Sequence, residues 1–245
     1  MIKLGYNIIT EEAIEADLAV TGHLCCIGGT GSGKSMAILY IINNVFDYIR
    51  KEKCKVSLYI CDFKKSGDYK KISNEFGEYA ETTEIIECFY REFEITEEGC
   101  QTIKILLIDE YASYISWLSQ IDKRKAEAIK TKLCSLLMLG RSRRTFVWVV
   151  QQRISSLLFP AATGAIDNFQ INLGVGRLSV ESRKTLFAGE HFEDQEFEEE
   201  YHPKIGQGII LIEGQSLQPI QIPYIEDKEL LKALLRKKSK ELHLI

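Results

Sequence analysis

The stretch IGGTGSGKSM, residues 27–36, constrains the fold most strongly, because it joins two apolar segments that call for different structures. LCCI, just before it, has the composition of a buried strand. MAILYIINNVFDYIRK, which follows, repeats apolar residues at the spacing of one helix face. Between them, Gly28 and Gly33-Lys34-Ser35 complete the pattern Gly-x-x-x-x-Gly-Lys-Ser. A strand, a phosphate-binding loop (P-loop) and a helix are therefore predicted in direct succession.

This loop predicts a bound nucleoside triphosphate with Mg²⁺. Its glycines allow positive φ angles, so that several backbone N–H groups can point into one concavity at a helix N-terminus. Lys34 would reach the β- and γ-phosphates, and the Ser35 hydroxyl would bind Mg²⁺. A glycine-rich turn without a ligand is the alternative, which the flanking strand and helix disfavour. The predicted ATP-binding residues are Gly28, Gly29, Thr30, Gly31, Ser32, Gly33, Lys34, Ser35 and Met36.

Apolar strands alternate with helical segments along the chain, which predicts an α/β fold with a parallel sheet covered by helices on both faces. Strands are expected in LCCIG, KVSLYICD, IKILLID, TFVWVV, FQINLGV and GIILIEG, and helices at 33–51, 122–139, 178–187 and 226–240. In such a sheet, ligands bind at the carboxyl ends of the strands, where the P-loop falls. We expect one domain over residues 1–245, with a leader at 1–22 and a C-terminal helix at 226–245.

Composition narrows the function classes. The formal net charge of −4 gives no global basic field, so any contact with nucleic acid must come from a local patch. No apolar run reaches the length of a membrane span, and residues 1–20 lack the core of a signal peptide. The seven cysteines show no Cys-x-x-Cys pair, which favours reduced thiols over a disulfide or metal set. We therefore expect a cytoplasmic protein without a membrane span of its own.

IKILLIDEYASY supplies the second catalytic element, because its apolar strand ends in Asp109 and Glu110. A carboxylate at the end of a strand beside the P-loop completes a magnesium shell, so Ser35 and Asp109 are the predicted metal ligands. The adjacent acid is placed to polarise a water for attack on the γ-phosphate. Most Asp-Glu pairs are solvated surface, but one that follows a buried strand downstream of a P-loop predicts a Walker B motif. Glu110 argues for hydrolysis.

A third element is GRSRRTFVWVVQQRIS, in which a buried strand ends in Gln151 and Gln152. An amide there could bond the attacking water and a γ-phosphate oxygen, or simply end the strand; spacing alone does not decide. Arg141 follows Gly140, which has the composition of a helix C-cap. It could interact with the helix dipole, which spacing favours, or reach a neighbouring subunit's nucleotide as an arginine finger.

With these pieces in register, the chain resembles the motor domain of the FtsK/SpoIIIE family, DNA-translocating ATPases of the FtsK–HerA superfamily that includes ATPases of conjugative elements. The resemblance covers about residues 3 to 225. Its specific parts are Leu4-Gly5, Asp17-Leu18 and His23-Leu24 before the P-loop, Asp62 and Lys64 after the second strand, LLIDEYASY, LGRSRRTFVWVVQQR, Ser182-Arg183, and the Gly-x-Gly of IGQGIILIEG.

The resemblance implies a RecA-like P-loop fold and an ATP-hydrolysing motor that translocates double-stranded DNA as a homo-oligomer, a hexameric ring. The predicted catalytic residues are Lys34, Asp109, Glu110, Gln152 as γ-phosphate sensor and Arg141 as a finger acting on the next subunit. Specificity would come from a partner such as a relaxase or replication protein, which could also bring the motor to a membrane. Conjugation, plasmid mobilisation, DNA packaging or segregation would suit it. The alternatives are a secretion-type ATPase of the same superfamily acting on protein, and a nucleotide-gated scaffold.

The sequence also departs from the family pattern. The span between Asp62 and the Walker B strand is short, and the membrane segment and winged-helix domain of the family are not expected here. Gln151 and Ile154 replace the family's usual Thr and Pro. The acid-rich residues 190–201 are interpreted as a solvated loop, or alternatively as a docking surface for a basic partner. The basic residues 123–132 suit either a solvated helix, which is favoured, or a DNA contact.

Overall fold

One ten-stranded sheet organises the chain in the computed structural model, which describes residues 1–161, 163–192 and 195–244. The strand order is β2-β1-β10-β9-β8-β3-β7-β6-β4-β5. The strands are β1 (Ile2–Asn7), β2 (Ala13–Ala16), β3 (Leu24–Ile27), β4 (Val56–Asp62), β5 (Phe76–Glu78), β6 (Ile103–Asp109), β7 (Thr145–Gln151), β8 (Ile171–Val175), β9 (Gln207–Ile212) and β10 (Gln218–Gln221).

The half of the sheet from β8 to β5 is parallel, and β3 lies at its topological centre, between β7 and β8. Ile27, the last residue of β3, is opposite Gln151 on one side and Gly174 on the other. The chain therefore leaves β3 at the carboxyl edge, between two strands of the same direction. This is where open α/β sheets bind their ligands.

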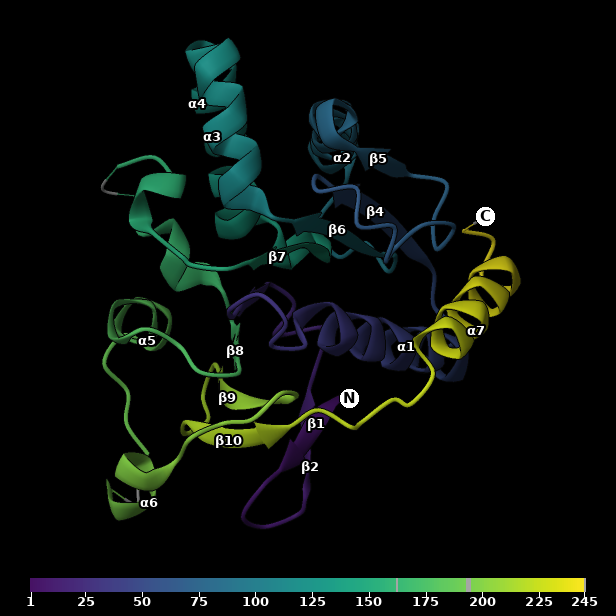
Figure 1. Ribbon diagram of the computed structural model, residues 1–245. Helices are drawn as coiled ribbons and strands as arrows, with labels where there is room; N and C mark the ends of the chain where they lie inside the picture. The colour runs from purple at the N-terminus through teal and green to yellow at the C-terminus, as the bar shows by residue number, and fades with distance from the viewer. Residues whose placement is uncertain (162, 193–194, 245) are drawn as a thin grey trace.

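The other half is antiparallel, because β9, β10, β1 and β2 each run opposite to the preceding strand in the sheet. The expected fold class is confirmed, with a sheet that is mostly parallel and helices on both faces. Strands β1, β2, β5 and β10 were not predicted. The leader at residues 1–22 contributes β1 and β2 to the far edge of the sheet (Figure 1).

The α-helices are α1 (Lys34–Glu52), α2 (Thr82–Ile95), α3 (Tyr111–Ile121), α4 (Lys123–Leu139), α5 (Val180–Phe187), α6 (Gln195–Glu200) and α7 (Lys228–Glu241). The four predicted helices correspond to α1, α4, α5 and α7 within a few residues, whereas α2, α3 and α6 were not predicted. Short 3₁₀ turns occur at Tyr79–Glu81, Arg141–Arg143, Ser156–Leu158 and Ala165–Asn168.

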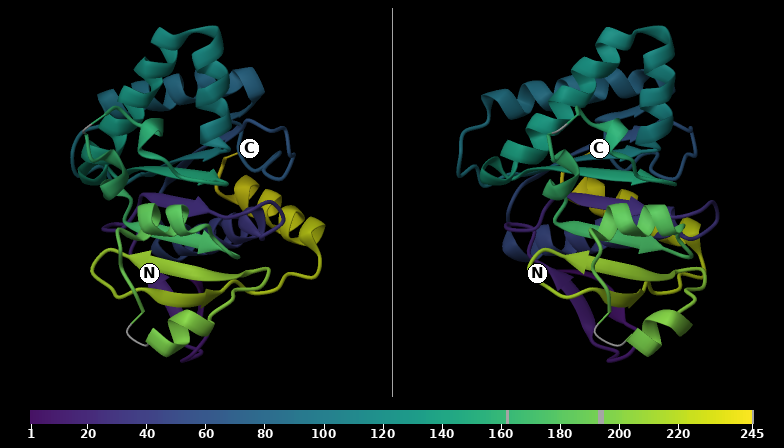
Figure 2. Two further views of the ribbon diagram at one scale, coloured as in Figure 1. Left: turned by 60° about the vertical axis from the view of Figure 1, so that its left-hand side comes forward. Right: turned by 90° about the vertical axis from the view of Figure 1, so that its left-hand side faces the viewer.

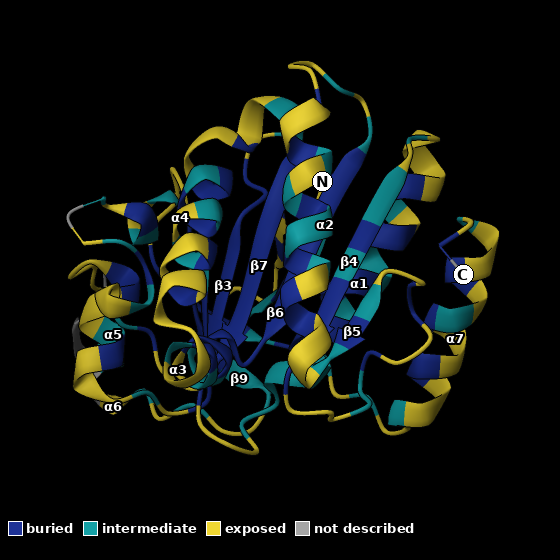
Figure 3. Cartoon of the chain, turned by 90° about the horizontal axis from the view of Figure 1, so that it is seen from above, coloured by how far each residue is buried: buried dark blue, intermediate teal, exposed yellow. Residues whose placement is uncertain are grey.

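Helices cover the two faces of the sheet separately. Figure 1 shows α2, α3 and α4 on one side of β4, β6 and β7 and α1 on the other, and α7 packs against α1. Seen from above, the strands are buried beneath helices that expose only their outer faces (Figure 3). Each face has its own apolar cluster, one built on α1 and one on α2, α3 and α4.

Helix α1 illustrates why these residues form these elements. Its buried residues form one face that packs on the sheet, with rows three to four positions apart such as Ile38, Ile42, Val45 and Ile49. The full set is Ala37, Ile38, Leu39, Ile41, Ile42, Val45, Phe46 and Ile49. Figure 2 shows the molecule from two further sides, with the α3–α4 hairpin at the end opposite β1 and β2. No helix in the described ranges is both long and apolar enough to cross a bilayer.

Candidate nucleotide site

The P-loop connects β3 to α1 and has the backbone that the glycine pattern predicts. Gly31 and Gly33 have φ angles of 76° and 105°, a conformation that side chains with a Cβ rarely adopt. The backbone N–H of Gly28 donates to the carbonyl of Gln151 over 3.3 Å, which continues the β3–β7 ladder into the loop. The Lys34 ammonium donates to the carbonyls of Gly28 at 2.7 Å and Gly29 at 2.9 Å, so it lies across the loop.

The antiparallel half of the sheet supports this loop from behind. The N–H of Gly206 donates to the carbonyl of Ser32 over 3.1 Å, from a turn with φ of 77° that only glycine adopts without strain. A Cβ on Gly28 would lie 2.3 Å from the carbonyl oxygen of Val175 at the end of β8. The Gly-x-Gly of the family pattern, here Gly206 and Gly208, therefore has a physical reason: it lets the start of β9 approach the P-loop and β8 closely.

The first predicted carboxylate, Asp109, lies at the carboxyl edge of β6, beside Val150 of β7 and Asp62 of β4. It is 6% exposed, and no described residue donates a hydrogen bond to its side chain. Burial raises the pKa of Asp109 to about 7, and the nearby Glu110 and Asp62 carboxylates raise it too. A buried carboxylate without a hydrogen-bond donor is the kind of group that binds a hard divalent cation.

Tyr69 is a residue of this site that sequence reasoning missed. Its hydroxyl is fully buried and has no well-formed hydrogen bond to any residue that the structure describes. Burial raises its pKa well above the usual range, and Asp109 raises it further, whereas the Ser35 hydroxyl acts in the opposite direction. Tyr69 is thus a neighbour of both predicted metal ligands. Ser35 and Asp109, with this orphaned hydroxyl beside them, fit a Mg²⁺ ion bound with water.

Glu110, the predicted catalytic base, has a left-handed backbone with φ of 63°, and its N–H donates to the carbonyl of Val150 over 2.7 Å. This backbone ends β6 and starts α3. The Glu110 carboxylate is 7% exposed, forms an ion pair with the Lys64 ammonium through Oε1, and accepts a hydrogen bond from the Ser113 hydroxyl at Oε2 over 3.3 Å. Both residues of the predicted Asp-x-Lys motif, Asp62 and Lys64, therefore lie at the site.

The two glutamines at the end of β7 have different environments. Gln151 is fully buried, and neither atom of its amide group has a hydrogen-bond partner among the described residues. Gln152, which the family resemblance assigns as the γ-phosphate sensor, is exposed one residue beyond the strand. Both lie at the same edge of the sheet as the P-loop, since Gln151 is opposite Ile27.

Arg141 is the one predicted catalytic residue that lies away from this edge. It precedes β7, so it is at the amino edge of the parallel strands, and its guanidinium is 3.6 Å from the Glu213 carboxylate. Both side chains are about half exposed. Arg141 cannot reach the P-loop of its own chain from there. A catalytic role for it requires the nucleotide of another subunit.

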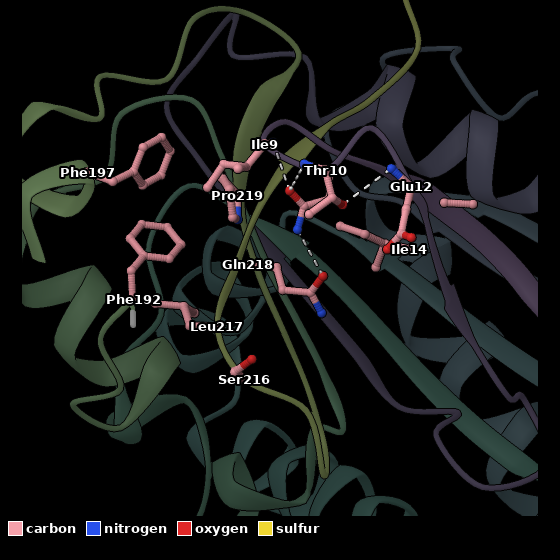
Figure 4. Close-up of a pocket in the computed structure, with 12 residues that line it drawn as sticks. Ile9, Thr10, Glu12, Ile14, Phe192, Phe197, Ser216, Leu217, Gln218 and Pro219 are labelled. Atoms are coloured by element: carbon pink, nitrogen blue, oxygen red, sulfur yellow. Dashed lines mark hydrogen bonds between the residues drawn. The ribbon is translucent and has the colours of Figure 1, made fainter. Parts of the chain in front are cut away.

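A separate cavity of about 490 Å³ lies between the β1–β2 turn, the β9–β10 turn, and Phe192 and Phe197, which lie just before and within α6. Figure 4 shows Phe192 and Phe197 on one side of it and Thr10, Glu12 and Ile14 on the other. None of the described residues that line it is a predicted site residue. The nucleotide site and this cavity are therefore distinct features.

The acid-rich segment 190–201 falls partly outside the described residues, at positions 193–194. Of the rest, the Glu198 carboxylate is not a free surface charge. It accepts hydrogen bonds from Arg183, from His191 at 3.0 Å and from the N–H of Phe192 at 3.0 Å. Its pKa is lowered by these groups, although burial acts against them. Part of this segment is thus folded onto α5.

The fold and the site together define a P-loop NTPase fold of the RecA-like type. No protein-family model matches the sequence, and no curated protein matches it. Solved structures do share the fold. The conjugation coupling protein TcpA of pCW3, in a monomer form with ATPγS, superposes with a TM-score of 0.71 at 17% identity over 99% of this chain and 70% of its own.

Two further solved ATPases have the same fold. The cytoplasmic domain of the type VII secretion ATPase EccC from Thermomonospora curvata gives a TM-score of 0.67 at 14% identity over 96% of this chain. ATPases 2 and 3 of EssC from Geobacillus thermodenitrificans give 0.65 at 14% identity over 98%. This chain spans 30% of the EccC chain and 48% of the EssC chain. The RecA-like P-loop fold that the sequence resemblance implies is thereby confirmed.

Proposed function

We propose that this protein is a Mg²⁺-dependent ATPase. The observation that carries the proposal is the convergence of Lys34 and Ser35 in the P-loop with Asp109 and Glu110 at one edge of the sheet. Ser35 and Asp109 would hold Mg²⁺, which would neutralise charge on the phosphates. Lys34 and the loop amides bind the triphosphate, and Glu110 orients the attacking water.

Two substitutions test this chemistry separately. Lys34→Ala removes the phosphate contact, so both binding of a fluorescent ATP analogue and hydrolysis should be lost. Glu110→Gln keeps the size of the side chain but removes its charge, so binding should persist while the hydrolysis rate falls about 10²- to 10⁴-fold. Glu127→Gln, an exposed acid on α4, is the matched control and should leave both unchanged. Native turnover in Lys34→Ala would refute the proposal.

We further propose that ATP hydrolysis drives translocation of double-stranded DNA by a homo-oligomeric ring, with Arg141 acting on the nucleotide of the adjacent subunit. The FtsK/SpoIIIE resemblance supports this, as does the shared fold of a conjugation coupling protein. The position of Arg141 at the opposite edge from the P-loop is compatible with such a ring. The resemblance implies that the ring is a hexamer. It also implies a relaxase or replication protein as the partner that supplies specificity.

The start of α4 offers a local basic patch for DNA. Lys123, Arg124 and Lys125 are exposed at the tip of the α3–α4 hairpin, and none of them forms an ion pair within the described ranges. The cations further along the same helix are already paired, Lys130 with Glu127 and Lys132 with Glu87. Free cations at a projecting tip can contact phosphates despite the net negative charge of the chain.

The hydrolysis rate should be measured without additions, with duplex DNA, with single strands and with basic proteins. We expect stimulation by duplex DNA that weakens as salt rises. Lys123→Glu/Lys125→Glu should lose the stimulation, and the charge-matched control Lys51→Glu/Lys55→Glu should keep it. An equal rate with and without every nucleic acid would refute the DNA-motor proposal and leave the ATPase proposal intact.

A secretion-type ATPase acting on protein is the second candidate, because the type VII secretion ATPase EccC shares the fold to nearly the same degree as TcpA. Stimulation by a basic protein rather than by duplex DNA would favour it. A nucleotide-gated scaffold would keep its function in Glu110→Gln, whereas either motor would lose it.

A further inference from the structure

Both oxygens of the Glu110 carboxylate, the proposed catalytic base, have partners in their own chain. Lys64 binds Oε1 as an ion pair, and Ser113 donates to Oε2 over 3.3 Å. A carboxylate polarises water through an oxygen lone pair directed at that water, and a bound ammonium weakens it as an acceptor. In this arrangement Glu110 is held by α3 and by Lys64, and neither contact involves the P-loop.

Lys64 is not a freely mobile surface lysine, because the turn that carries it is built around a buried carboxylate. Asp62 is fully buried and accepts hydrogen bonds from the N–H of Ser66 at 2.9 Å, the Ser66 hydroxyl at 3.0 Å and the N–H of Gly67 at 2.8 Å. The N–H of Lys65 also donates to the Asp62 carbonyl over 3.1 Å. Asp62 therefore fixes the path of the chain that places Lys64 on Glu110.

Residues 66–74, which follow this turn, are joined by ion pairs and hydrogen bonds to α7, the helix that packs against α1. Asp68 pairs with Lys228 at 2.7 Å and with Lys232 at 3.3 Å. Further along, the Ser239 hydroxyl donates to the carbonyl of Ile72 over 2.7 Å. Two more hydrogen bonds join Arg236 to the Lys70 carbonyl and the Asn74 N–H to the Leu244 carbonyl. Displacement of α7 must therefore move or strain the turn that holds Lys64.

We propose that Lys64 is a positioning residue that holds Glu110 in a resting orientation, and that α7 sets this restraint through residues 62–74. A neighbouring subunit or partner that displaces α7 would release Glu110 toward the attacking water. This inference rests on the proposed ATPase function and adds a regulatory contact to it. It assigns a role to the Asp-x-Lys motif that phosphate binding does not require.

Removal of the Lys64 charge tests the restraint directly. In Lys64→Met, the basal kcat should rise about threefold to fivefold, the upper part of the range that one ordinary ion pair sets, while KM for MgATP stays unchanged. Lys64→Arg keeps the ion pair and should remain within about twofold of the wild type. Lys65→Met is the matched control, because this neighbouring lysine contacts the Tyr79 ring and not Glu110. An unchanged or reduced kcat in Lys64→Met would overturn the proposal.

The proposed effect of α7 on the Lys64 restraint is tested by Asp68→Asn. Hydrogen–deuterium exchange is measured on the nucleotide-free protein. Exchange in residues 62–74 should become faster, and the basal kcat should rise in the same direction as in Lys64→Met. Glu229→Gln is the control, because Glu229 pairs with Lys232 but does not contact residues 62–74. Wild-type exchange, or faster exchange with a wild-type kcat, would overturn the link.

These outcomes are distinguishable from failure of the proposed function itself. If the wild type and Lys34→Ala hydrolysed ATP at the same rate, the ATPase proposal would fail whatever Lys64 does. If the wild type were active, Lys34→Ala inactive and Lys64→Met unchanged, only the restraint would fail.

Discussion

A pH-dependent loss of stability should follow from His23, which precedes β3. Its imidazole is fully buried, and Nδ1 accepts a hydrogen bond from the N–H of Val147 over 2.9 Å, so the proton of the neutral ring is on Nε2. Nε2 has no partner among the described residues. Burial lowers the pKa of His23 to about 3, and the Arg141 guanidinium lowers it further.

The sign and size of this pH dependence follow from the difference in the number of protons that the unfolded and folded states bind. The unfolded chain protonates His23 near pH 6.5, whereas the folded chain does not until about pH 3, so the unfolded state binds more protons between these values. Stability due to the neutral imidazole is therefore present above pH 6.5 and is lost as the pH falls. Between pH 7.5 and pH 5 the loss amounts to roughly 2 kcal/mol, at about 1.4 kcal/mol per pH unit below 6.5.

The measurement is urea unfolding followed by tryptophan fluorescence, which reports on Trp148, a fully buried residue of β7, and on Trp117 of α3. His23→Asn keeps an acceptor for the Val147 N–H and does not titrate in this range. It should be less stable than the wild type at pH 7.5, because it packs less well, but the difference should shrink by about 2 kcal/mol at pH 5. Comparing the two proteins cancels the carboxylates that titrate in both. Parallel stability curves over this range would refute the reasoning.

Three further substitutions probe the support of the site. Gly206→Ala adds a Cβ at φ of 77°, and we expect a loss of about 1–2 kcal/mol in urea unfolding and weaker binding of ATP analogues; unchanged affinity would contradict the role of this turn. Gly208→Ala would place a Cβ 1.9 Å from the Gly174 carbonyl oxygen, so thermal unfolding should show a loss of roughly 2–4 kcal/mol. Gln151→Leu removes a buried amide without partners, and its stability should equal or exceed that of the wild type by up to about 1–3 kcal/mol. Destabilisation by this change would show that the amide is bonded after all.

The parallel half of the sheet could be predicted because its strands are buried on both faces. Strands β6 and β7 are buried at every position, which produces the continuous apolar runs that the sequence shows. The position of the candidate site followed from the same runs, because Asp109 and Gln151 come at the ends of these strands. The same apolar runs therefore predicted both the parallel strands and the position of the candidate site.

Four strands, three of the antiparallel half and β5 at the edge of the parallel half, were missed for the opposite reason. Strand β2 has only four residues and exposes every second one, and β5 has three residues that include a glycine. Segments this short carry little periodicity, and their pairing depends on partners far away in the chain. Strand β1, for example, pairs with β10 more than two hundred residues later, as in Asn7 with Ile220.

The side-chain contacts at the site could not be predicted from the sequence either. The Asp-x-Lys spacing gave no sign that Lys64 would meet Glu110, because that contact depends on the left-handed backbone of Glu110 and on the turn around Asp62. Which of Gln151 and Gln152 could act as the γ-phosphate sensor likewise depends on the residue at which β7 ends. The family resemblance selects Gln152, and the assignment stays a prediction that substitution of each glutamine can decide.

The antiparallel half is best understood as the support of the P-loop. A glycine-rich loop has few side chains with which to hold its own shape, so its conformation must be fixed by neighbouring backbone. Here that backbone comes from the end of β8 and the start of β9, through the Gly206 N–H and the close approach of Val175 to Gly28. Strand β9 can lie there only because β10 and β1 complete the sheet beside it. Residues at both ends of the sequence thus contribute to the support of the P-loop.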